Sequence, residues 1–185
     1  MISYKRPESV LVVVHTRAGE VLLLERARPR GFWQSVTGSL EWDESAMAAA
    51  RREVREETGL RATDGLRPLG RTVRFRIVPP WRERYAPTAR FNTEHWFRLE
   101  LPARRLIRLR GTEHRQHRWL PAALAAQRAT SWTNRQAIRL VFGLPGAADR
   151  RSFHPGVAGV LRHGDPQARG VDRSGAPEDG ALRTA

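Results

Sequence analysis

The sequence predicts an α/β fold in which buried strands are followed by an amphipathic helix and by further strands and helices. Residues 9–15 and 20–26 are apolar runs, rich in valine and leucine, that are joined by Arg17-Ala-Gly19. Such runs are typical of strands buried on both faces of a sheet, so we expect a buried hairpin. Residues 46–58 have the composition of a helix, and residues 71–78 alternate basic with apolar side chains, which is typical of a strand with one polar face.

The helix that follows the hairpin carries signals at both ends. Ser45 can cap its first turn, and the alanines after it are among the strongest helix formers. Gly59 stands where a left-handed residue normally ends a helix. Met47, Ala50 and Val54 recur at helical spacing and form an apolar stripe that we expect to face the core.

Two further strands and two further helices are expected later in the chain. The strands are predicted at 93–101 and 118–120. Pro121 then opens an alanine-rich helix, and residues 133–142 form a last helix that ends at Gly143. These elements continue the same domain.

Two segments have the pattern of neither element. Pro79-Pro80 stops the alternating strand, and the polar residues 81–90 after it are expected to form a mobile loop. Residues 146–185 are rich in glycine, aspartate, arginine, alanine and proline, and contain too little apolar surface to offset their ordering entropy. We therefore expect one domain over 1–145 and a disordered, low-complexity tail, in which a short element around 157–161 is an alternative.

The composition narrows the class of protein. The chain has 185 residues, which is enough to bury a sizeable core, and no apolar run approaches the ~18 residues of a membrane span. It has no cysteine, which excludes disulfides and thiolate metal sites, and we identify no export signal before the first strand. We expect a cytoplasmic protein with no membrane partner and no obligatory protein partner.

The net charge of +14 attracts polyanions, which include triphosphates and nucleic acids. The basic residues are arginines scattered through every expected element, and Lys5 is the only lysine. This distribution indicates a general preference for arginine and not a built groove, so a nucleic-acid partner is not expected.

Three acids in the first helix are the strongest indication of chemistry. Glu53, Glu56 and Glu57 stand at i, i+3 and i+4, so they share one helix face and repel one another. A divalent cation between them removes that repulsion, and ligands that are all oxygens favour a hard ion such as Mg²⁺, for which Mn²⁺ can substitute. Glu57 falls about 60° from Val54 around the helix, which directs the acids toward a cleft beside the core. A solvated acidic face is the alternative.

These acids belong to a longer pattern with fixed gaps, which resembles the Nudix box of the Nudix hydrolases. Every fixed position is filled, by Gly38, Glu44, Arg52, Glu53, Val54, Glu56, Glu57, Gly59 and Leu60. The resemblance implies the Nudix fold, a mixed β-sheet sandwiched between α-helices. It also implies a metal-dependent hydrolase that cleaves a linkage of the nucleoside-diphosphate type. Glu44 and Arg52 are expected to brace the loop and the helix.

Further segments between residues 4 and 142 resemble one branch of that family, the bacterial dihydroneopterin triphosphate diphosphatases. They are Tyr4-Lys-Arg-Pro7, Phe32-Trp-Gln-Ser-Val-Thr-Gly38, Arg71-Thr-Val73, Arg84-Tyr-Ala-Pro87, Asn92-Thr-Glu94, Trp96-Phe97, Thr112-Glu-His114 and Ser131-Trp-Thr-Asn-Arg-Gln-Ala-Ile138. The resemblance implies Mg²⁺-dependent hydrolysis of 7,8-dihydroneopterin triphosphate to dihydroneopterin monophosphate and pyrophosphate, in folate biosynthesis. In such chemistry, positioning and charge neutralisation dominate over covalent catalysis.

The same resemblance implies roles for the acids. Glu53 and Glu57 hold Mg²⁺ from the helix, with Glu56 beside them. Glu113 completes the metal shell from a distant loop, because a helix supplies ligands from one side only. Glu113 is also the candidate that orients or deprotonates the attacking water, with Glu56 as the alternative.

The substrate needs cations for its phosphates and a pocket for its flat ring. By resemblance, Lys5 and Arg26 bind the substrate, and Thr37 lies where its hydroxyl or backbone meets phosphate. The candidates at the ring are Phe75, Ile77, Val78, Ser131, Trp132 and Asn134, with His114 as a supporting group.

Two alternative functions remain open at this point. A Nudix hydrolase of ordinary or oxidised nucleoside triphosphates is the first, because guanine and pterin rings share hydrogen-bonding edges. The second is a non-catalytic Nudix domain that binds nucleotide or RNA, against which the complete set of acids argues.

Overall fold

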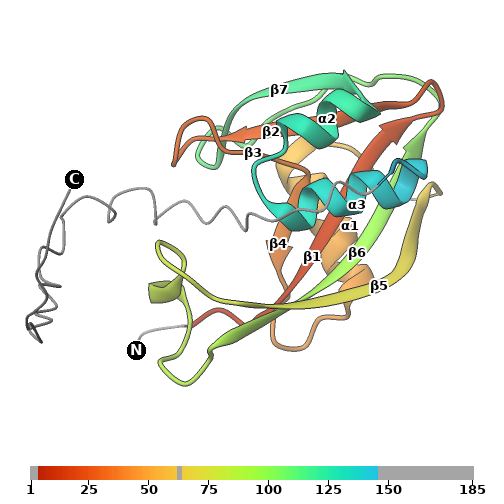
Figure 1. Ribbon diagram of the computed structural model, residues 1–185. Coiled ribbons are helices and arrows are strands. Elements are labelled where there is room, and N and C mark those ends of the chain that lie inside the picture. Colours follow the sequence, from red (N-terminus) through yellow and green to blue (C-terminus); the bar gives the residue numbers. More distant parts are fainter. Residues whose placement is uncertain (1–3, 62–63, 146–185) are drawn as a thin grey trace, which may run out of the picture.

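The computed structural model describes residues 4–61 and 64–145, and its elements form a sheet with helices on both sides (Figure 1). In chain order the elements are β1 (Glu8–Thr16), β2 (Glu20–Arg26), β3 (Trp33–Gln34), β4 (Val36–Ser39), α1 (Ala46–Thr58), β5 (Leu66–Arg76), the 3₁₀ helix η1 (Arg82–Arg84), β6 (Phe91–Leu101), β7 (His114–Pro121), α2 (Ala122–Arg128) and α3 (Trp132–Phe142).

The seven strands form one mixed sheet. Its main path runs β3-β2-β1-β6-β5, with β4 paired to β1 and β7 paired to β2. The central pair is parallel, because β1 lies beside β6 with Glu8 opposite Thr93 and Thr16 opposite Leu101. All other pairs are antiparallel. The α/β class and the mixed sheet expected from the sequence are both confirmed.

The expected hairpin of β1 and β2 pairs only at its closed end. His15 opposite Val21 is the only register pair of these two strands. Farther from the turn the strands diverge, since β1 continues against β4 while β2 continues against β3 and β7. The predicted hairpin of buried strands is therefore confirmed, but its pairing is confined to the closed end because the segment 33–39 supplies partners to both strands.

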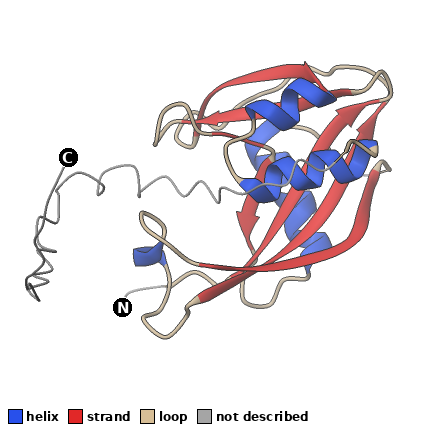
Figure 2. Ribbon diagram, in the orientation of Figure 1, coloured by secondary structure: helices blue, strands red, loops and turns tan. Residues whose placement is uncertain are grey.

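Helices cover both faces of the sheet, with α1 on one face and α2 and α3 on the other (Figure 2). Alternate residues of β1 point to opposite faces, as the pleat requires. Val10, Val12 and Val14 pack in the core beneath α1. Leu11 and Val13 pack in the second core, beneath α2 and α3. This arrangement explains why β1 reads as an uninterrupted apolar run.

Helix α1 begins and ends at the predicted residues. The hydroxyl of Ser45 accepts a hydrogen bond from the Ala48 amide, which caps the first turn. Gly59 has a φ of 74°, a left-handed conformation that favours glycine, and ends the helix. Ala50 and Val54 are fully buried, whereas Met47 packs at the edge of the core.

Several predicted boundaries differ from the observed ones. β5 covers Leu66–Arg76 instead of 71–78, because it pairs with β6 in two stretches separated by an irregularity between Pro68 and Thr72. β7 covers His114–Pro121, where only 118–120 was expected, because β2 pairs with it along its length. The last helix starts one residue earlier than expected, after Ser131 caps it.

The loop predicted at 81–90 contains η1 and is attached to neighbouring elements. The Lys5 amide donates to the Arg84 carbonyl at 2.9 Å, and the rings of Phe32 and Trp81 meet edge to face at 5.7 Å. Its expected mobility stays a prediction. Residues 146–185, with the short element suggested at 157–161, lie outside the described residues, so the predicted tail is not tested.

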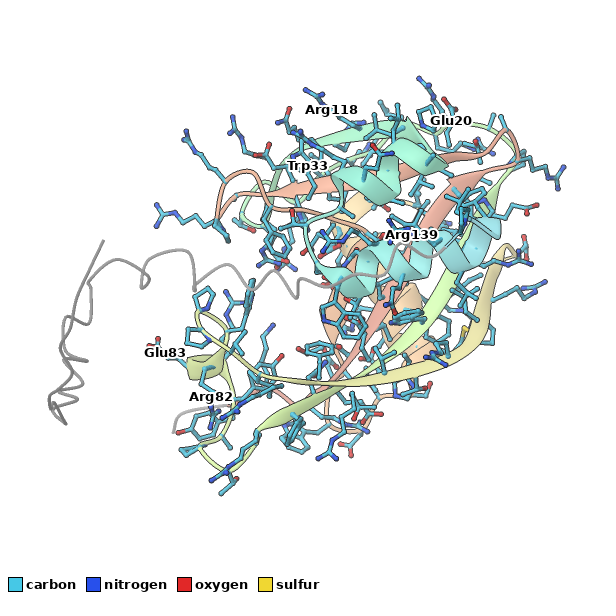
Figure 3. All side chains as sticks on the ribbon, in the orientation of Figure 1. Glu20, Trp33, Arg82, Glu83, Arg118 and Arg139 are labelled. Atoms are coloured by element: carbon cyan, nitrogen blue, oxygen red, sulfur yellow. The ribbon has the colours of Figure 1, made fainter. Side chains whose placement is uncertain are left out.

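The basic side chains are distributed over several elements, as their scatter in the sequence predicted. Among the labelled residues of Figure 3, Arg82 lies on η1, Arg118 on β7 and Arg139 on α3. The Arg118 guanidinium lies 5.5 Å from the ring centre of Trp33. Within the described part of the chain, no helix is long and apolar enough to cross a membrane.

Candidate active site

A cavity of about 530 Å³ opens between α1, the start of α3, the ends of β5 and β6, and the segments before β1 and after β2. It brings together residues far apart in the sequence. The predicted site residues that line it are Lys5, Arg26, Thr37, Glu53, Glu56, Phe75, Ile77, Val78, Glu113, Ser131, Trp132 and Asn134. Two of the predicted residues, Glu57 and His114, do not line it.

The acids of α1 differ in burial. Glu57 has only 1% of its surface exposed and Glu53 only 8%, whereas the Glu56 side chain is 39% exposed. The expectation that the acids face a cleft beside the core therefore holds for Glu53, which lines the cavity. Glu57 is more deeply buried and does not line the cavity, and Glu56 lines it with a partly exposed side chain.

Gly38 leaves space for the Glu53 carboxylate. A Cβ atom at residue 38 would lie 1.8 Å from Glu53 Cδ, a distance no structure tolerates. Gly38 lies in β4, and the absence of a side chain there lets the Glu53 carboxylate lie directly beside the backbone.

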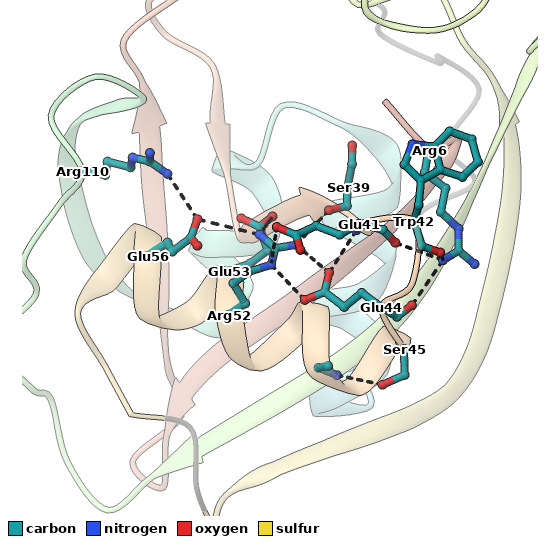
Figure 4. Close-up of polar contacts among 11 residues, drawn as sticks. Arg6, Ser39, Glu41, Trp42, Glu44, Ser45, Arg52, Glu53, Glu56 and Arg110 are labelled. Atoms are coloured by element: carbon teal, nitrogen blue, oxygen red, sulfur yellow. Dashed lines mark hydrogen bonds and ion pairs between the residues drawn. The ribbon is translucent and has the colours of Figure 1, made fainter. Parts of the chain in front are cut away.

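Arg52 braces the loop before α1, as predicted (Figure 4). Its guanidinium donates to both Glu44 oxygens at 2.9 and 2.8 Å, to Glu53 Oε1 at 2.7 Å and to the Ser39 carbonyl at 3.0 Å. These bonds raise the pKa of Arg52, mainly through Glu44, and hold the pKa of Glu44 below its usual value. Arg52 thus fixes the side chain of Glu53 as well as the loop.

Negative charge on the buried side of α1 is only partly compensated. Burial, and then the charge of Glu57, raise the pKa of Glu53 to about 7 even though Arg52 opposes the shift. Burial also raises the pKa of Glu57, although the neighbouring His114 favours its charged form. Two carboxyls with raised pKa values on one helix face are a feature of metal and catalytic sites.

Glu57, Glu113 and His114 form the group best placed to hold a metal ion in the described residues. One ligand atom from each lies within 4.8 Å of the others. His114 Nε2 is 2.9 Å from Glu57 Oε1, and the His114 side chain has no exposed surface. The Thr37 amide donates to the second oxygen of Glu57 at 3.3 Å. His114 therefore contacts Glu57, and its predicted role as a supporting group at the substrate stays a prediction.

The predicted four-acid set is not gathered into one group. Glu53 turns toward Arg52, while Glu56 and Glu113 turn toward Arg110, whose Nη1 lies 3.2 Å and 3.6 Å from their oxygens. Arg110 is a site residue that the sequence did not indicate, because its partners come from α1 and from the turn before β7.

Cations also line the cavity. Lys5, Arg26 and Arg84 all contribute to its wall. Burial lowers the pKa of Arg26, and the charge of Arg84 lowers it further. Two cations close enough to disfavour each other form a natural site for an anion. Arg84 was not among the predicted site residues, although its Arg-Tyr-Ala-Pro segment was noted.

The remaining wall is aromatic and polar. The rings of Phe75 and Trp132 meet edge to face with centres 6.5 Å apart. Asn134 accepts a hydrogen bond from the Ser35 amide at 2.6 Å and donates to the Ser131 hydroxyl at 2.7 Å. These contacts fix the start of α3 against the segment that follows β3.

Asn92 and Glu94 also line the cavity and were not predicted as site residues. Both are buried on β6, and burial raises the pKa of Glu94 to about 7. The signal available in the sequence was the alternation of the strand. Glu94 lies two residues from Asn92 and two from Trp96, so the three side chains share one face.

The chain matches the family model described as NUDIX domain over residues 5–141. It is 48% identical over 139 residues to the dihydroneopterin triphosphate diphosphatase of Escherichia coli, which covers 73% of this chain and 91% of that protein. It is 36% identical over 143 residues to the dihydroneopterin triphosphate diphosphatase of Haemophilus influenzae, covering 75% and 89%. The solved structure of the E. coli dihydroneopterin triphosphate pyrophosphohydrolase superposes with a TM-score of 0.68 at 47% identity, over 74% of this chain and 94% of that chain.

Proposed function

The chain belongs to the Nudix family of hydrolases, and we propose that it converts 7,8-dihydroneopterin triphosphate to dihydroneopterin monophosphate and pyrophosphate. One observation carries the proposal: a single cavity is lined by helix acids, by arginine and lysine, and by aromatic and apolar side chains. A pterin triphosphate has the matching parts, since its phosphates need cations and a metal and its ring needs a flat apolar slot. Relatives with 48% and 36% identity bear the name of this activity.

The acids of the site fit a hard divalent cation, for which we propose Mg²⁺, with Mn²⁺ as a substitute. Carboxylate oxygens predominate among the candidate ligands Glu53, Glu57 and Glu113, with His114 close to Glu57. The raised pKa of Glu53, caused by burial and by Glu57, means that negative charge here lacks full compensation. A bound cation would supply that compensation and would withdraw charge from the polyphosphate.

Glu113 and Glu56 remain the candidates that orient or deprotonate the attacking water. Both side chains are about two-fifths exposed, at 42% and 39%, and both line the cavity, so they are accessible to water. Arg110 contacts both carboxylates and holds them on the same side of the cavity. The kinetics of a single substitution at each position would distinguish the two candidates.

Lys5, Arg26 and Arg84 are proposed to bind the phosphates, with Thr37, which also lines the cavity, as a further donor. The Lys5 amide donates to the Arg84 carbonyl at 2.9 Å, so the segment before β1 is joined to the loop that carries η1 at the cavity wall. Phe75, together with the neighbouring Ile77 and Val78, is proposed to contact the pterin ring. The cytoplasmic location expected from the sequence stays a prediction.

Product analysis in ¹⁸O-labelled water tests substrate, products and site of attack together. The purified full chain is incubated with Mg²⁺ and 7,8-dihydroneopterin triphosphate, dATP or 8-oxo-dGTP, and kcat/KM is compared. The proposal expects pyrophosphate and a monophosphate, with the pterin as the best substrate. If the pterin is the poorest of the three, the nucleotide alternative replaces the proposal. Metal-independent nucleotide or RNA binding without turnover would instead favour a non-catalytic domain.

A further inference from the structure

Glu94 is a buried carboxyl that the proposed chemistry does not use. It is 5% exposed, lies on β6 opposite Val73 of β5, and contributes to the cavity wall. Residues two apart on a strand share a face, so Asn92 lies beside it, opposite Phe75. The carboxyl therefore lies at the aromatic end of the cavity.

Glu94 has neutral partners only. Its Oε1 accepts a hydrogen bond from the Trp96 indole at 2.9 Å, and the hydroxyl of Thr133 also bonds to it. Within residues 4–61 and 64–145, no lysine, arginine or histidine forms an ion pair with it. Removing an ionised carboxyl from water without a countercharge is costly, and burial accordingly raises its pKa to about 7. A glutamine would hold Trp96 and Thr133 without this cost, so structural support alone does not account for the charge.

Asn92, at the same end of the cavity, has a side-chain oxygen that lacks a hydrogen-bond partner. Its Nδ2 donates to the Ser9 hydroxyl at 2.6 Å, which leaves Oδ1 as the free acceptor. That oxygen is buried and has no hydrogen-bond partner in the structure. Buried acceptors without partners are rare and call for a ligand or water. The floor of this end of the cavity thus offers hydrogen-bond acceptors, a carboxylate and an amide oxygen, side by side.

We propose that Glu94 is a specificity-determining residue that binds the ring edge of the substrate by accepting hydrogen bonds from a ring N–H and the adjacent exocyclic amine. A pterin presents these two donors next to each other, and a carboxylate accepts both at once. Asn92 Oδ1 provides a further acceptor beside it. The inference rests on the proposed function, because it names the group that recognises the ring while the acids of α1 and the cations serve the phosphates.

This assignment predicts which rings are rejected. Adenine presents an amine next to a ring nitrogen that is an acceptor, so the lone pair of that nitrogen would face the carboxylate. An unmatched polar pair in a buried site discriminates strongly between ligands. Guanine presents the same two donors as a pterin and is not rejected by Glu94, so other contacts separate guanine from pterin.

The test is Glu94→Gln in the full chain, which keeps the shape and an acceptor for Trp96 but replaces one acceptor oxygen by a donor. We expect kcat/KM for 7,8-dihydroneopterin triphosphate to fall at least about tenfold, mainly through KM, while kcat/KM for dATP stays equal or rises. Binding of phosphate-free dihydroneopterin, measured by calorimetry with EDTA present, should weaken by a similar factor. Glu100→Gln is the matched control, on the same strand and outside the cavity, where its partner is Arg17.

The outcomes separate the inference from the proposed function. If the wild-type protein prefers the pterin and Glu94→Gln keeps both that preference and dihydroneopterin binding, Glu94 does not read the ring and the inference fails alone. If the wild-type protein prefers 8-oxo-dGTP and the variant loses that preference against dATP, the proposed substrate fails but the role of Glu94 stands. Near-ultraviolet circular dichroism of the variant checks that the Trp96 environment is unchanged, and a folded variant with unchanged selectivity overturns the proposal.

Discussion

The backbone of Gly38 passes directly beside the carboxylate of Glu53. The two residues come from β4 and α1, and a Cβ atom at residue 38 would lie 1.8 Å from Glu53 Cδ and from Oε1. The contact therefore couples β4 to an acid of α1. A side chain at residue 38 would therefore displace the carboxylate end of Glu53 and not the backbone.

Gly38→Ala should therefore impair activity far more than stability. The added methyl forces Glu53 away from its place beside Arg52, and we expect turnover to fall at least about tenfold. The side chain can rotate, so the free energy of unfolding should fall by no more than about 1–2 kcal/mol. Steady-state kinetics and urea unfolding measure the two effects. Gly111→Ala is the control, since a Cβ there meets no atom within 4 Å. Normal turnover of Gly38→Ala would show that Glu53 needs no fixed position.

Glu57→Gln should lower turnover by orders of magnitude without unfolding the protein. The change removes one charge at almost constant volume from a fully buried position. Because burial raises the pKa of Glu57, the neutral glutamine should leave the metal-free protein as stable or more stable. Pyrophosphate release and thermal melts in EDTA measure both quantities, with the exposed Glu83→Gln as control. Near-normal turnover would contradict the metal role of Glu57.

Arg52→Ala should destabilise the protein by about 2 kcal/mol, because it leaves Glu44 and Glu53 without their shared partner. The side chains of these acids are only 12% and 11% exposed, so the loss is larger than for a surface ion pair. Arg52→Lys should recover only part of the stability, since an ammonium has three donors and cannot replace the four hydrogen bonds that the guanidinium makes. A double-mutant cycle with Glu44→Gln gives the coupling energy, and a coupling near zero would rule out the proposed brace.

The pH dependence of stability should report Glu94. Its pKa is raised to about 7 in the folded chain from 4.5 in the unfolded chain, so below pH 4.5 both states are protonated. Between these values only the folded chain holds the proton, and rising pH lowers the free energy of unfolding until it levels off above about pH 7. Glu94→Gln should remove this decline and be about 1–3 kcal/mol more stable than the wild type at pH 8, with little difference at pH 4.5. Glu53 contributes a decline of the same sign in both proteins, so the difference between their curves isolates Glu94. Identical pH dependence of the two proteins would show that Glu94 is not a buried ionisable group.

Removal of residues 146–185 should leave activity and solubility close to those of the full chain. The basis is composition, since this segment has few large apolar side chains to pack against the domain. The match to the family model ends before it, at residue 141. Steady-state kinetics on the two chains give the answer, and a loss of solubility or rate on truncation would mean that the segment packs on the domain.

The sequence alone determined the elements whose signals lie within a few residues. Ser45 and Gly59 define the ends of α1 because capping is local, and the spacing of Glu53 and Glu57 defines a shared face because the helix period is constant. The pattern of acids also indicated a metal site and the Nudix family before any contact was known.

Only the tertiary structure decided which distant residues meet. Arg110 at Glu56, His114 at Glu57, and the acceptors of Asn92 and Glu94 beside Phe75 all depend on how β1, β6 and β7 pair and on where β1 and β2 diverge. Pairing between strands is a non-local choice, made by the packing of two cores on the sheet and not by the residues of one segment. For the same reason a buried carboxyl such as Glu94 could be noted in the sequence as part of a resemblance, but its burial and lack of a countercharge could not.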